Sequence, residues 1–185
     1  MCPTNRVRET YIFLAILAFV VALVGCGKSK QKMQISGLSS LSPEKREIVN
    51  LGITQFNELV GEEVVSESPG GYPLSLEVHS LGIMNSIEPA IQGLEIRNGY
   101  ATANPKGCVI KLLGDILNKR NIGTAVTVVM HEIAHCAGLN HTDTTDDLMS
   151  ARTLPYSALT PDAIKRFTRD VRVLLGRSVD AVLCQ

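Results

Sequence analysis

Three of the four histidines in this 185-residue chain fall within one short segment, His131–His141 (HEIAHCAGLNH). In an α-helix, positions i and i+4 share one face, so a helix here presents the imidazoles of His131 and His135 to a single metal ion. Gly138 can take the left-handed conformation that ends a helix, and the chain can then bring His141 back to the same ion. The spacing therefore predicts a metal site with three histidine ligands.

The residues before this segment indicate where the helix lies. Residues 125–130 (AVTVVM) are apolar nearly all round, which predicts that a helix over about residues 124–137 is buried. The plain alternative is a pair of hydrogen-bonded core histidines on a buried helix. That alternative does not account for a third histidine placed just beyond a glycine, so the metal site is the preferred interpretation.

The ligand set points to chemistry rather than to a structural role. Three neutral imidazoles leave the fourth position of a tetrahedral Zn²⁺ open for water, which is typical of catalytic zinc sites. Glu132 lies beside the ligands in the sequence, where its carboxylate can take a proton from a metal-bound water. We therefore expect Zn²⁺ as the cofactor, His131, His135 and His141 as its ligands, and Glu132 as the catalytic base.

These residues resemble the HExxHxxGxxH signature of the metzincin zinc metallopeptidases. Metzincins carry a methionine-containing turn after the third histidine, and Met149, in the segment DLMS, is similar to it. The spacing looks most like the matrixin branch, which has a Pro-x-Tyr segment lining the pocket for the residue after the scissile bond. Pro155 and Tyr156 resemble that segment, although here the two residues are adjacent.

The resemblance implies a metzincin-like zincin fold with Met149 packed beneath the metal. It also implies a substrate-pocket or oxyanion role for Pro155 and Tyr156. A peptide or protein substrate is expected to lie extended along an edge strand above the metal, formed by the strand that contains Cys108 or by the strand before it.

The rest of the chain indicates an α+β fold, with a small twisted mixed sheet, the buried active-site helix and a C-terminal helix. Alternating or apolar runs predict strands over residues 74–78, 94–103 and 108–112. A capping residue followed by proline begins a first helix at Ser42 and a last helix at Thr160. These helices are expected to end at Gly61 and Gly176, respectively.

The N-terminus resembles a bacterial lipoprotein signal. Arginines precede an apolar run over residues 11–25, which is too short for a membrane span and is followed at once by Cys26. We expect residues 1–25 to be a signal peptide, residues 26–41 to be the lipidated Cys26 with a flexible tether, and residues 42–185 to be the metallopeptidase domain.

This signal places the domain outside the cytoplasm, anchored in the cell envelope through its N-terminal lipid. The residue after the lipidated cysteine is Gly27 rather than the aspartate that retains some lipoproteins at the inner membrane. An outer-membrane or periplasmic location is therefore favoured in a cell with two membranes.

Charge and cysteine content limit the other functions. The 18 basic and 18 acidic side chains balance, which gives no electrostatic reason to expect nucleic-acid binding. We expect a monomer. Cys108, Cys136 and Cys184 remain beyond the signal, and they permit either one disulfide with one thiol left over or three buried free thiols.

The predicted function is that of an envelope-tethered zinc endopeptidase that hydrolyses peptide bonds by Glu-assisted attack of a metal-bound water. Two alternatives remain open. One is a binding module that holds zinc without cutting, although an intact Glu132 argues against it. The other is a hydrolase whose substrates are the peptides of the cell wall.

Overall fold

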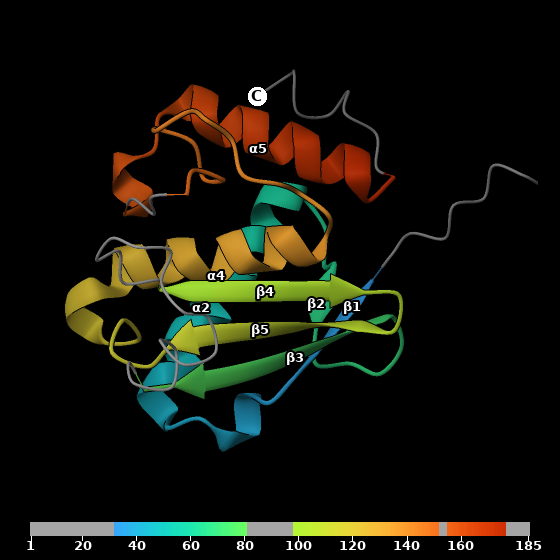
Figure 1. The fold of residues 1–185 in the computed structure, drawn as a ribbon, viewed down its shortest axis with the longest axis vertical. Coiled ribbons are helices and arrows are strands. Elements are labelled where there is room, and N and C mark those ends of the chain that lie inside the picture. Colours follow the sequence, from blue (N-terminus) through green and yellow to red (C-terminus); the bar gives the residue numbers. More distant parts are fainter. Residues whose placement is uncertain (1–31, 81–97, 152–154, 177–185) are drawn as a thin grey trace, which may run out of the picture. The chain divides into compact units, whose positions relative to one another are not determined.

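The structure is a computed structural model that describes residues 32–80, 98–151 and 155–176 (Figure 1). The predicted signal peptide, Cys26 and Cys184 lie outside these residues. No helix within the described ranges has the length and apolar character needed to cross a membrane.

Within the described residues, five strands form one sheet, in the order β2-β1-β3-β5-β4. Its pairings are parallel except for β4, which runs antiparallel to β5 and forms one edge of the sheet. Asn104 lies opposite Gly107, so a tight turn joins these two strands. The strands are β1 (Met33–Ser36), β2 (Val65–Ser66), β3 (Tyr72–His79), β4 (Gly99–Asn104) and β5 (Gly107–Leu113).

Among the described residues, three α-helices accompany the sheet, with α4 lying between β4 and α5 (Figure 1). They are α2 (Pro43–Val60), α4 (Ile122–Cys136) and α5 (Pro161–Leu174), and the short 3-10 helices are η1 (Leu38–Ser40), η2 (Lys119–Asn121) and η3 (Tyr156–Ala158). Helix α2 approaches α4 closely at Gly52, where an added Cβ would lie 2.6 Å from Val129 Cγ1. An edge-to-face contact between Phe56 and Phe167, with centroids 6.1 Å apart, joins α2 to α5.

The predicted α+β fold is confirmed: the sheet is mixed, the helix that carries the histidines is buried, and a helix follows it near the C-terminus. Helices α2 and α5 begin at the prolines that follow the predicted caps. The hydroxyl of Thr160 accepts a hydrogen bond from the Ala163 amide, as an N-cap residue should.

The predicted tether through residue 41 is wrong over its second half. Met33 and Ile35 are buried at 1% and 3% exposure in β1, which lies between β2 and β3, and Leu38 is buried in η1. The four residues of β1 alternate between the two faces, and this brief pattern is hidden by the polar and basic residues around it. The folded part of the chain therefore begins before Ser42.

The structure also resolves the choice between cysteines. Cys108 and Cys136 form a disulfide with their Cα atoms 5.7 Å apart. Both residues are buried, at 2% and 5% exposure. The bond joins the beginning of β5 to the last residue of α4, directly after His135.

Candidate metal centre

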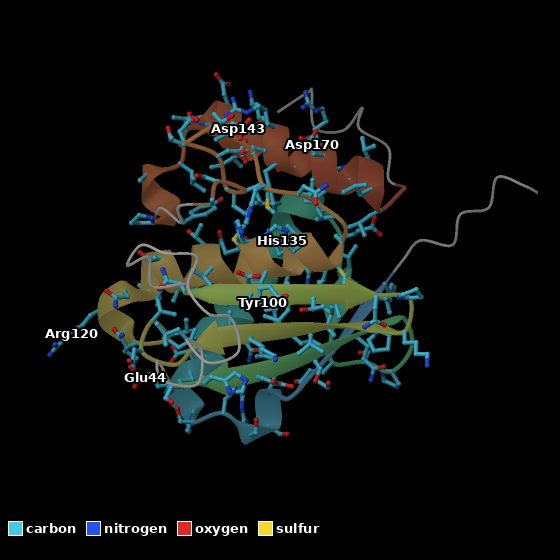
Figure 2. All side chains as sticks on the ribbon, in the orientation of Figure 1. Glu44, Tyr100, Arg120, His135, Asp143 and Asp170 are labelled. Atoms are coloured by element: carbon cyan, nitrogen blue, oxygen red, sulfur yellow. A yellow bond between two sulfur atoms is a disulfide. The ribbon has the colours of Figure 1, made fainter. Side chains whose placement is uncertain are left out.

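Helix α4 brings the first two histidines to the site from within the core. Its residues from Ala125 to Ala134 are all buried, including His131 at 5% and Glu132 at 4% exposure. His135, one turn further on, lies on the side of α4 that faces away from β4 (Figure 2). The helix is thus held by apolar contacts around most of its circumference.

The end of α4 is a Schellman motif built on Gly138, whose φ is 100°. The Leu139 amide donates to the Ala134 carbonyl at 3.0 Å, and the Gly138 amide donates to the His135 carbonyl at 2.9 Å. A residue with a side chain rarely adopts this φ. The glycine predicted to end the helix therefore does so, and it turns the chain back toward the helix.

The returning chain brings His141 to the two helical histidines. The Nε2 atoms of His131 and His135 lie 2.9 Å apart, and each lies 3.1 Å from Nε2 of His141. The three predicted ligands thus form one group suited to a metal ion, with His131 buried, His135 half-buried and His141 exposed.

The hydrogen bonds behind the site fix which ring nitrogens carry protons. Nδ1 of His131 donates to the Leu148 carbonyl and Nδ1 of His135 donates to the Leu139 carbonyl, each at 2.7 Å. A carbonyl can only accept, so each Nδ1 carries the proton and, in the neutral ring, each Nε2 presents a lone pair. Such support behind histidine ligands is usual at metal sites in proteins.

This arrangement fits a metal ion better than it fits a cluster of histidines alone. Two Nε2 lone pairs that face each other at 2.9 Å repel unless a cation or a proton lies between them. Tetrahedral zinc, with Zn–N distances of 2.0–2.1 Å, places its nitrogen ligands about 3.3 Å apart. The observed separations of 2.9–3.1 Å are close to that value.

Burial favours the neutral form of the innermost ligand. Desolvation lowers the pKa of His131 from its ordinary 6.5 to about 4; the hydrogen bond to Leu148 opposes this shift, and nearby His135 and His141 add to it. His131 is therefore neutral at pH 7, which is the form that binds a metal.

Glu132 lies against the edge strand of the sheet. A Cβ added at Gly99, the first residue of β4, would lie 2.5 Å from Oε1 of Glu132 and 2.9 Å from its Cγ and Cδ. The backbone of β4 therefore passes so close to the Glu132 side chain that any side chain at this position would require Glu132 to move. This role of Gly99 could not be predicted, because nothing in the sequence distinguishes it from other strand glycines.

The structure places the remaining predicted site residues as follows. Met149 is buried at 2% exposure, and its carbonyl accepts a hydrogen bond from the amide of Thr142, the residue after His141. Pro155 lies near the first turn of α4, since a Cβ at Gly123 would be 3.7 Å from its Cβ. The Met149 carbonyl therefore bonds the residue beside the ligand His141. Pro155, by contrast, lies near the N-terminal end of α4, away from the histidines.

Tyr156 is half-buried in η3. Burial raises the pKa of its hydroxyl, and the nearby charge of Glu58 on α2 raises it further. The hydroxyl therefore stays protonated at neutral pH and can act as a donor. A role for Pro155 or Tyr156 in a substrate pocket or in oxyanion stabilisation stays a prediction.

Comparisons with known proteins give little beyond this geometry. No protein-family model matches the chain, and no curated protein matches it in sequence. Among solved structures, the chain is similar to archaemetzincin from Methanopyrus kandleri, with a TM-score of 0.49 and 17% identity over 82% of this chain and 99% of that one. A likeness this distant carries no argument about function, which depends on the side chains of the site.

Proposed function

We propose that this chain is a zinc metalloendopeptidase of the metzincin type. The observation that carries the proposal is the triangle of Nε2 atoms, in which two of the three rings have their other nitrogen engaged by a backbone carbonyl. Three imidazoles complete only part of a tetrahedral shell, and this is the ligand count of catalytic rather than structural zinc.

The chain's own residues divide the chemistry among them. Zn²⁺, when bound by His131, His135 and His141, supplies Lewis-acid chemistry that makes water more acidic and polarises a carbonyl group. The carboxylate of Glu132 accepts the proton of the attacking water and then donates it to the departing amide nitrogen. Burial of Glu132 against β4 holds that carboxylate in one place, so little reorganisation is needed at each turnover.

The edge of the sheet offers a place for an extended substrate. Among the described strands, β4 pairs only with β5, so one side of its backbone is available to another strand. We propose that the peptide substrate adds to this edge by backbone hydrogen bonds. The sequence suggested either the strand that contains Cys108, which is β5, or the strand before it, which is β4. Strand β5 lies inside the sheet, so β4 is the strand suited to pair with a substrate.

A cleavage assay with the full-length chain, purified in detergent, tests the proposal. Wild type is expected to cut a mixed peptide library, and both a chelator and Glu132→Gln are expected to abolish cutting. Glu132→Gln should still bind zinc, because the three ligands are intact. Glu47→Gln is the matched control, since its side chain is 70% exposed on α2; this variant should cut normally.

The same assay separates the alternatives. Zinc binding without cleavage of peptides or of cell-wall fragments would show a binding module and overturn the proposed activity. Cleavage of cell-wall fragments alone would move the substrate class to the peptides of the wall. Normal cleavage by Glu132→Gln would show that this residue is not the base.

We further propose that the domain is tethered to the cell envelope, outside the cytoplasm, as a monomer held by lipid on Cys26. The support is the arginine-flanked apolar run that ends at this cysteine. Metabolic labelling with a fatty acid should mark wild type and leave Cys26→Ser unlabelled. Equal labelling of both proteins would refute the tether.

A further inference from the structure

The turn at Asp147–Ser150, called here the 147–150 turn, is organised by a buried carboxylate. Asp147 is 5% exposed, and its Oδ1 accepts a hydrogen bond from the Met149 amide at 2.9 Å. Its own carbonyl accepts from the Ser150 amide at 3.0 Å. Side chain and backbone of one residue therefore close the turn together.

One carbonyl of this turn bonds a metal ligand, and a second bonds the residue beside another ligand. The Leu148 carbonyl accepts the hydrogen bond from Nδ1 of His131 at 2.7 Å. The Met149 carbonyl accepts from the Thr142 amide at 3.0 Å, and Thr142 directly follows His141. The position of this one turn therefore bears on two of the three ligands, one from α4 and one from the returning chain.

The charge of the turn is balanced from α5. Nε of Arg166 lies 3.4 Å from Oδ2 of Asp147, and its Nη2 lies 3.6 Å from Oδ1 of Asp146. The Asp147 side chain is only 6% exposed, whereas that of Arg166 is 39% exposed. A buried carboxylate is costly without a counter-charge, so Arg166 helps to keep Asp147 in place.

We propose that Asp147 and Arg166 are positioning residues of the metal site. Asp147 fixes the 147–150 turn, and the Leu148 and Met149 carbonyls of that turn hold His131 and the His141 segment in the geometry that binds metal. Arg166 holds Asp147 from α5. This inference rests on the proposed function, because it assigns these residues to the same metal site.

Metal affinity and coordination geometry test the inference, with full-length protein purified in detergent. Zn²⁺ affinity is measured by competition with a chromophoric chelator, and geometry is read from the visible absorption of the Co²⁺ form. Asp147→Asn and Arg166→Gln should each lower Zn²⁺ affinity by about 10-fold, the lower end of what loss of a partner behind a ligand costs. Both should also alter the Co²⁺ spectrum, which a purely structural role elsewhere would not move.

Two further variants complete the design. Arg166→Lys keeps the charge and should restore most of the lost affinity. Arg169→Gln removes an arginine of the same helix that pairs with Asp170 and is 53% exposed; it should match wild type in both measurements. If Asp147→Asn does not fold, Arg166→Gln decides, because that side chain is partly exposed.

Wild-type affinity together with a wild-type Co²⁺ spectrum in folded Arg166→Gln would overturn the inference. Failure of the proposed activity gives a different result, because wild type would then bind Zn²⁺ without cutting any peptide while the Asp147 and Arg166 variants still lowered metal affinity. If wild type itself binds neither Zn²⁺ nor Co²⁺, the metal site is absent and the inference about Asp147 and Arg166 fails with it.

Discussion

The two parts of the chain that meet at the metal centre hold their ligands by different means. Helix α4 fixes His131 and His135 through regular backbone geometry and burial against the core. Residues 139–151, which follow Gly138, contain no helix, and a turn and a few backbone hydrogen bonds hold His141 there. Exposure follows the same division, since His131 is buried and His141 is exposed.

The difference shows where such a site is robust and where it is not. Contacts of α4 with the sheet and with α2 are many and individually small, so no single one decides the place of His131. The returning segment depends on single bonds, such as the one between the Thr142 amide and the Met149 carbonyl. Substitutions in α4 and substitutions in the returning segment should therefore have different effects, and the following variants test this difference.

The largest effect is expected from removing a ligand of α4. His135→Ala leaves two nitrogens at the site, and its Zn²⁺ affinity should fall well beyond the roughly 100-fold that changes behind a ligand cost. Metal analysis of the purified protein should find it free of zinc, and peptide cleavage should be absent. His79→Ala is the control, because His79 pairs with Glu77 instead, and it should retain full zinc occupancy. A zinc-loaded His135→Ala protein would show that His135 is not a required ligand.

The next effect is a loss of stability on the helical side. The Cys108–Cys136 disulfide closes a segment with a sequence separation of 28 residues. By loop-closure entropy, replacing both cysteines with serine should lower the free energy of unfolding by about 3–4 kcal/mol. Guanidinium unfolding in the presence of a chelator measures this loss in the free energy of unfolding without any contribution from bound metal. An unchanged unfolding midpoint would indicate that the two cysteines do not pair.

A smaller effect separates the base from the ligands. Gly99→Ala should push the buried Glu132 carboxylate out of place, because the new Cβ would lie within 3 Å of it. We expect kcat/KM to fall by about 10- to 100-fold, since misplacement of about 1 Å has costs of this size. Zinc affinity should stay unchanged. Ala103→Ser, at an exposed position of the same strand, should leave both values at those of wild type; equal activity of the two variants would contradict the placement of Glu132.

The smallest effect tests the returning segment alone. Gly138 has a φ of 100° and Gly70 has a φ of 102°, and an added Cβ would meet nothing within 4 Å at either position. Alanine at each should therefore cost about 1–2 kcal/mol of stability through backbone strain only. Zinc affinity should fall a few-fold in Gly138→Ala and not at all in Gly70→Ala. An equal affinity in the two variants would mean that the helix end does not position His141.

The same division explains how much of the site the sequence could predict. The i and i+4 spacing of His131 and His135 follows from helix geometry, and the left-handed Gly138 follows from its missing side chain. The Leu139 and Leu148 carbonyls could not be predicted, because every residue has a carbonyl and only the folded chain decides which one reaches a ring. Gly99 was missed for a similar reason: its role depends on how closely β4 approaches Glu132.

The fold shows a comparable limit. Helices α2, α4 and α5 and strands β3 to β5 carry caps, turns or periodic patterns long enough to be recognised. Strand β1 has four residues, too few for its alternation to stand out, although it is an interior strand that pairs with β2 and β3. The pairing of Cys108 with Cys136 depends on α4 returning beside β5, which spacing alone does not specify.

Zinc-edge X-ray absorption of the purified full-length chain tests the central claim most directly. We expect one zinc per chain, bound by three imidazole nitrogens at 2.0–2.1 Å, with the signal lost in His135→Ala. Sulfur ligands near 2.3 Å, or no stoichiometric metal in wild type, would contradict a zinc centre formed by His131, His135 and His141.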